Sequence, residues 1–159
     1  MVAPEILEQI LARIPQQAPF RFVDELLELS DEHARGAYRF REDEFFYAGH
    51  FPGEPITPGV ILIEAMAQMV LVPLAIYLGA GVDAARVLPL FAEADQVEFQ
   101  ASVRPGQRVI AHGERIYYRR QKLKCRVELT FEDGTPVANA VLSGIAVAVP
   151  AQAAGATSA

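Results

Sequence analysis

The stretch from Val60 to Leu78, VILIEAMAQMVLVPLAIYL, decides the fold. It is long enough and apolar enough to pass the usual length screen for a membrane span. Three features argue against a span: two polar residues (Glu64 and Gln68), an interruption at Pro73, and no basic cluster at either end. A helix that is apolar all round is equally typical of a soluble core. The stretch therefore predicts a buried central helix, which Pro73 should kink or divide.

Strand-like runs separated by turn signals make up most of the remaining chain. Before them, apolar residues at helical spacing predict a helix from Pro4 to Ile14. The pair Asp133–Gly134 is typical of a two-residue hairpin turn. The strands that this pattern predicts are Phe20–Leu29, Ala34–Phe40, Leu88–Ala94, Gln96–Val103, Arg108–Tyr118, Lys122–Phe131 and Pro136–Val149.

The order of these elements favours an α+β fold in which an antiparallel sheet wraps around one long central apolar helix. A sheet with one buried face needs a cover, and a helix that is apolar on all sides needs to be enclosed. Wrapping the sheet around the helix satisfies both needs, and this arrangement is called the hot-dog fold. We expect one such domain over residues 1–149 and a disordered, Ala-rich tail over residues 150–159.

Charge and cysteine content exclude several classes of function. A net charge of −6 argues against nucleic acid as the main partner, because phosphate binding needs a dense basic face. Cys125 is the single cysteine, so the chain can form no intrachain disulfide and no cysteine zinc cluster. A small core residue is its expected role. The segment from Met1 to Gln9 lacks the pattern of a secretory signal, and we expect a cytoplasmic protein.

The residues suited to catalysis lie in a long loop and in the helix that follows it. The loop from Phe45 to Gly59 is rich in proline and glycine, and such loops often carry function. It contains His50, and histidine has the unperturbed pKa, about 6.5, that suits a general base near neutral pH. Glu64 and Gln68 lie four residues apart and so share one helix face. A carboxyl in an apolar helix can act as a general acid, oriented by the glutamine.

The start of the helix adds a candidate site for a carbonyl oxygen. The residues Gly59 and Val60 offer unpaired backbone N–H groups at the positive end of the helix dipole. A base, an acid and a site that polarises a carbonyl are what β-elimination of water from a 3-hydroxyacyl thioester requires. On residue type alone, a structural role for His50 and a solvated role for Glu64 stay open. We see no metal-ligand spacing and no phosphate-binding loop, so we expect neither a metal nor a cofactor.

Three motifs surround the start of the helix: Gly49-His50-Phe51-Pro52-Gly53-x-Pro55, then Pro58-Gly59-Val60, then Glu64-Ala65-Met66-Ala67-Gln68. Together they resemble the signature of the FabZ-type 3-hydroxyacyl-[acyl carrier protein] dehydratases. The likeness extends from about Ile14 to Val147. It implies a hot-dog fold and the dehydration of (3R)-3-hydroxyacyl thioesters to trans-2-enoyl thioesters. The pathway would be fatty-acid, polyene or polyketide synthesis, with acyl carrier protein as the carrier.

The resemblance also implies a role for each residue of the motifs. By position, His50 corresponds to the base that removes the C2 proton, and Glu64 to the carboxylate that helps the C3 hydroxyl leave as water. Gly59 corresponds to the residue whose N–H contacts the thioester carbonyl, and Gln68 to the glutamine that supports the glutamate. The neighbouring residues Phe51 and Val60 are further candidates for substrate binding. In the family, the histidine and the glutamate of one site come from different subunits, which implies a homodimer or a higher homo-oligomer.

The chain departs from the family pattern at two places. It has Pro15-Gln16-Gln17 where the family commonly has Pro-His-Arg. The segment from Gln96 to Ala101 lacks the basic residues that often occur there, so coenzyme A stays open as an alternative carrier. Two other functions also stay open: a hot-dog acyl thioesterase, and a non-catalytic acyl-binding subunit.

Overall fold

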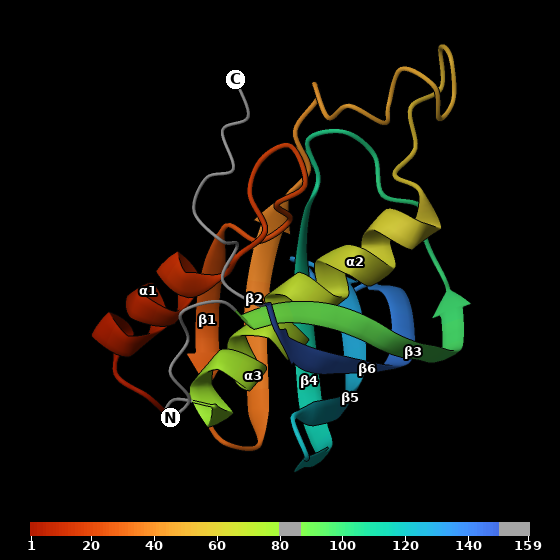
Figure 1. Ribbon diagram of the computed structural model, residues 1–159. Coiled ribbons are helices and arrows are strands. Elements are labelled where there is room, and N and C mark those ends of the chain that lie inside the picture. Colours follow the sequence, from red (N-terminus) through yellow and green to blue (C-terminus); the bar gives the residue numbers. More distant parts are fainter. Residues whose placement is uncertain (80–86, 150–159) are drawn as a thin grey trace, which may run out of the picture.

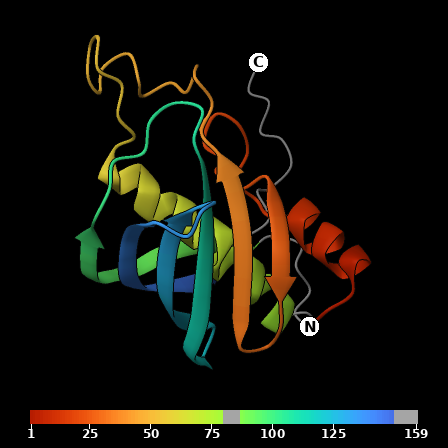
Figure 2. The same cartoon turned by 180° about the vertical axis from the view of Figure 1, so that it is seen from behind.

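The computed structural model describes residues 1–79 and 87–149, and the predicted tail over 150–159 lies outside the described residues. Six strands form one antiparallel sheet in the order β1-β2-β4-β5-β6-β3. Two helices in line, α2 and α3, cross one face of this sheet (Figure 1), and the view from behind shows the strands that cover them (Figure 2). The α+β hot-dog arrangement predicted from the sequence is confirmed. The elements are α1 Pro4–Arg13, β1 Glu25–Leu29, β2 His33–Arg39, α2 Gly59–Met69, α3 Leu71–Leu78, β3 Val87–Phe99, β4 Arg108–Arg119, β5 Lys122–Phe131 and β6 Pro136–Ala148.

The central apolar stretch is divided into α2 and α3 at Val70, as its proline predicts. Pro73 has no N–H to donate to the carbonyl of Met69, and its ring would collide with that carbonyl in a continuous helix. Val70 leaves the helical conformation with φ −122° and ψ −63°. The combined segment Gly59–Leu78 has the length and composition of a membrane span, but 67% of its most apolar window is buried inside the fold. It is therefore the core helix of this domain.

Three predicted strand boundaries are wrong. The runs predicted as Leu88–Ala94 and Gln96–Val103 merge into one strand, β3, because residues on both sides of Asp95 pair with β6, and this strand ends at Phe99 rather than at Val103. The break expected there is an irregularity in register, with Gln96 at φ +50°. The first strand begins at Glu25 and not at Phe20, because the backbone before it is bound to a helix side chain, described below.

The core lies between the helix pair and the inner face of the sheet. Leu123, Cys125, Val127 and Leu129 alternate along β5 and are almost fully buried. The predicted core role of Cys125 is confirmed, and burial raises the pKa of its thiol to about 12. At neutral pH the thiol is therefore protonated and is no candidate nucleophile.

Candidate active site

The loop between β2 and α2 holds His50 by its own backbone. The N–H of Ile56 donates to the carbonyl of His50 at 2.9 Å, and the imidazole Nδ1 lies 2.8 Å from the carbonyl oxygen of Ile56. A carbonyl only accepts hydrogen bonds, so Nδ1 carries the proton in this contact. In the neutral ring this leaves Nε2 with a free lone pair. The geometry therefore presents His50 as a base through Nε2.

A buried contact anchors the base of the same loop. The hydroxyl groups of Tyr47 and Thr57 lie 2.6 Å apart, and both residues are buried. The burial raises the pKa of the Tyr47 hydroxyl, so it stays a neutral hydrogen-bonding group. A further bond from Thr57 N–H to the carbonyl of Val103, at 2.8 Å, ties the loop to the segment after β3. The loop is thus fixed at its base, while the ring of Phe51 stacks on His50 at 4.1 Å and remains half exposed.

Glu64 and Gln68 are linked as their spacing predicts. The Gln68 Nε2 donates to Glu64 Oε1 at 2.8 Å, and Gln68 is fully buried whereas Glu64 is partly exposed. The same Nε2 donates to the carbonyl of Phe20 at 3.0 Å, and Gln68 Oε1 accepts the N–H of Phe22 at 2.7 Å. Every hydrogen-bonding group of this amide is therefore used. The bond from Gln68 therefore holds the Glu64 carboxyl by its Oε1.

The start of α2 is the candidate oxyanion site. The first backbone bond of the helix runs from Ile61 N–H to the carbonyl of Pro58 at 2.9 Å, so the N–H groups of Gly59 and Val60 precede it. The ring of Phe99 covers Gly59 so closely that a Cβ there would lie 2.8 Å from Phe99 Cζ. The side chain of Val60 is 73% exposed. The helix start is therefore open to a ligand on the Val60 side.

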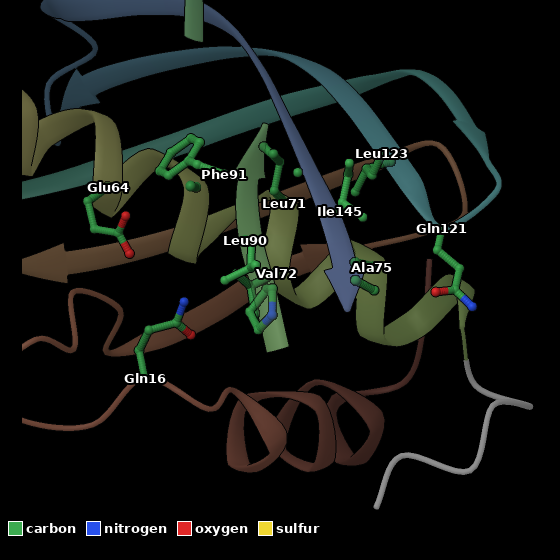
Figure 3. A pocket seen from close by; sticks show the side chains of 14 residues that line it. Gln16, Glu64, Leu71, Val72, Ala75, Leu90, Phe91, Gln121, Leu123 and Ile145 are labelled. Atoms are coloured by element: carbon green, nitrogen blue, oxygen red, sulfur yellow. The ribbon is translucent and has the colours of Figure 1, made fainter. Parts of the chain in front are cut away.

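A narrow apolar cavity of about 60 Å³ adjoins Glu64 (Figure 3). A second cavity, of about 210 Å³, shares part of its lining and extends toward Arg13 and Tyr118. Both are walled by α2–α3 on one side and by β3 and β6 on the other. The residues common to the two cavities are Val72, Ala75, Pro89, Gln121 and Ala146. Their position next to a carboxylate suits an extended acyl chain.

One chain does not bring all of the predicted residues together. Glu64 lines the first cavity, but His50, Phe51, Gly59 and Val60 are absent from the lining of both cavities described here. The structure also places in the lining of the first cavity, across from Glu64, a polar residue that was not selected from the sequence. This residue is Gln16, and the available signal was its place in the Pro15-Gln16-Gln17 departure from the family pattern.

Comparisons with known proteins find one matching family and relatives that share one name. A family model described as the FabA-like domain matches residues 14–140. A protein named 3-hydroxyacyl-[acyl-carrier-protein] dehydratase FabZ from Petrotoga mobilis is 32% identical, over 87% of this chain and 96% of its own length. A protein of the same name from Bacillus pumilus is 34% identical, over 82% of this chain and 96% of its own length.

Solved structures share the fold at low sequence identity. The dehydratase heterocomplex ApeI:P from Xenorhabdus doucetiae matches with a TM-score of 0.71 and 16% identity, covering 91% of both chains. A mutant thioesterase from Pseudomonas aeruginosa matches with a TM-score of 0.63 and 17% identity, covering 90% of this chain and 94% of the other. At these identities the likeness is one of fold.

Proposed function

Since the chain belongs to the FabA-like domain family, we propose that it dehydrates 3-hydroxyacyl thioesters with His50 as base and Glu64 as acid. The observation that carries this proposal is that hydrogen bonds orient both side chains, the imidazole of His50 and the carboxyl of Glu64. Within residues 1–79 and 87–149, His50 is held through its Nδ1 by Ile56 and has Nε2 without a partner, and Glu64 is held through its Oε1 by Gln68 and has Oε2 without a partner. The relatives named as 3-hydroxyacyl-[acyl-carrier-protein] dehydratases support the same reaction.

The proposed reaction is a β-elimination. The Nε2 of His50 takes the proton from C2, the electron pair of that bond forms the C2–C3 double bond, and the C3–O bond breaks. A protonated Glu64 gives its proton to the departing hydroxyl, which leaves as water. The N–H groups of Gly59 and Val60 polarise the thioester carbonyl and so make the C2 proton more acidic. The elimination has no net redox change, so the proposed chemistry requires no cofactor.

We propose that the complete site is shared between two copies of the chain. In this structure Glu64 lines the acyl cavity while His50 does not. The strand β3 is one of the two edge strands of the sheet, and a sheet edge is a template for pairing with another chain. It carries exposed large apolar side chains, with Leu90 51% and Phe99 50% exposed. A dimer across β3 would cover these side chains and could bring the partner's loop to the cavity.

The proposed substrate is an acyl group on acyl carrier protein, as in the names of the relatives, and the proposed location is the cytoplasm. Coenzyme A thioesters are the second candidate. The segment Gln96–Ala101 contains Glu98 and no basic residue, so it offers an acidic carrier no charge attraction. An enzyme indifferent to the carrier would turn over both kinds of thioester at similar rates.

The test is hydration of a short trans-2-enoyl thioester, followed by loss of enoyl absorbance, on both carriers. We expect turnover by the parent and losses of at least about 100-fold in His50→Ala and Glu64→Gln, the usual contribution of a general acid or base. As a control, circular dichroism is measured to check that each variant is folded. Release of free thiol without hydration would support a thioesterase, and full activity of His50→Ala would overturn the assignment.

A further inference from the structure

Gln16 reaches the cavity from a rigid piece of backbone. The chain leaves α1 at Ile14, and Arg21 donates from Nη1 to the carbonyls of Ile14 (3.3 Å) and Gln16 (3.2 Å) and from Nη2 to that of Leu11 (3.0 Å). These three bonds fix the segment that carries Gln16. Figure 3 shows the Gln16 amide and the Glu64 carboxylate facing each other at one end of the cavity, with Gln121 at the other end.

The Gln16 amide has unused hydrogen-bonding capacity. Within residues 1–79 and 87–149, Oε1 of Gln16 is the buried side-chain oxygen or nitrogen for which no hydrogen-bond partner is present. Such atoms are rare in folded proteins because leaving one unpaired costs free energy. The terminal amide can turn about its last bond, which has a broad torsional profile, so either its oxygen or its nitrogen can face the cavity.

The apolar wall of the cavity limits which groups can form a hydrogen bond with the Gln16 amide. Near Glu64 the wall consists of apolar side chains, among them Ala67, Leu90 and Phe91. An acyl chain in this cavity offers no hydrogen bond along its methylene groups. The group that can pair with Gln16 is therefore a polar substituent of the acyl chain that lies level with Glu64.

We propose that Gln16 binds the C3 hydroxyl of the substrate from the side opposite Glu64 and selects 3-hydroxyacyl over saturated acyl thioesters. The inference rests on the proposed function, which places the C3 hydroxyl at Glu64. A hydroxyl both donates and accepts, so it can pair with the Gln16 amide and still receive a proton from Glu64. A saturated acyl chain cannot form this hydrogen bond, so the Gln16 amide does not strengthen its binding.

The test compares binding of 3-hydroxybutyryl and butyryl thioesters by calorimetry, on the carrier that the parent turns over faster. His50→Ala is the background, so that the hydroxy thioester is not consumed. Gln16→Met keeps the length of the side chain and removes the amide. We expect it to weaken binding of the hydroxy thioester by about 3- to 10-fold, the worth of one neutral hydrogen bond. Binding of the saturated thioester should change by less than about 2-fold.

The matched control is Gln17→Met, since Gln17 is exposed and its Nε2 bonds to the carbonyl of Ile14 at 3.3 Å, outside the cavity lining. It should leave both affinities unchanged. Gln16→Leu repeats the test if the methionine variant does not fold. Equal weakening of the two thioesters by Gln16→Met, or no change in either, would overturn the inference while parent turnover still supported the dehydratase. A parent without turnover would instead refute the proposed function.

Discussion

Gln68 joins two parts of the chain that are far apart in sequence. Its bond to Glu64 follows from their spacing on one helix face, and that contact was predictable. Its bonds to Phe20 and Phe22 bridge 48 and 46 residues, and no local pattern contains that information. These long-range bonds also explain why the strand predicted from Phe20 begins only at Glu25. The donor at Phe22 is already used by Gln68.

Replacing Gln68 should therefore affect both stability and activity. Gln68→Leu leaves the buried N–H of Phe22 and the carbonyl of Phe20 without their partner and frees Glu64 to turn. We expect a loss of about 2–4 kcal/mol in the free energy of unfolding, measured by urea denaturation, because unpaired buried polar groups are costly. Gln17→Leu, at an exposed position, should change stability by less than about 0.5 kcal/mol. Equal stability of the two variants would contradict the role assigned to Gln68.

The helix pair touches the sheet at glycines on two neighbouring strands. A Cβ at Gly113 on β4 would lie 2.3 Å from Cγ1 of Val70, and a Cβ at Gly36 on β2 would lie 3.0 Å from the Cβ and carbonyl oxygen of Met69. The junction between α2 and α3 therefore packs directly on the backbone of the sheet. Pro73 made the junction predictable, but the glycine contacts depend on the strand register and on where the helix crosses the sheet.

An added methyl group at this crossing should weaken the fold. We expect Gly113→Ala to lower the free energy of unfolding by about 1–3 kcal/mol, because Val70 and the surrounding packed core must shift. This corresponds to a fall in Tm of about 2–4 °C for each kcal/mol in a domain of this size. Gly49→Ala is the control, since a Cβ at Gly49 meets no atom within 4 Å. A Tm for Gly113→Ala as high as that of Gly49→Ala would contradict the close packing.

At the scale of the whole molecule, the proposed active site is shared between two chains. The motifs predict His50 and Glu64 as its residues, and the resemblance implies that they come from different subunits. Sequence patterns could not have placed Gln16 in the same cavity as Glu64. Its position depends on the turn after α1 and on the hydrogen bond that Arg21 donates to the Gln16 carbonyl. The exposed apolar edge at β3 and the absence of His50 from the cavity lining both support the proposal that a second copy completes the site.

The most direct test of the shared site is complementation between two inactive variants. Dimers of His50→Ala mixed with Glu64→Gln by refolding contain, by random pairing, about half heterodimers, each with one intact site out of two. We predict recovery of about a quarter of the parent activity, while each variant refolded alone stays inactive. Native mass spectrometry verifies that heterodimers form. Heterodimers without activity would contradict a site built from the His50 of one subunit and the Glu64 of the other.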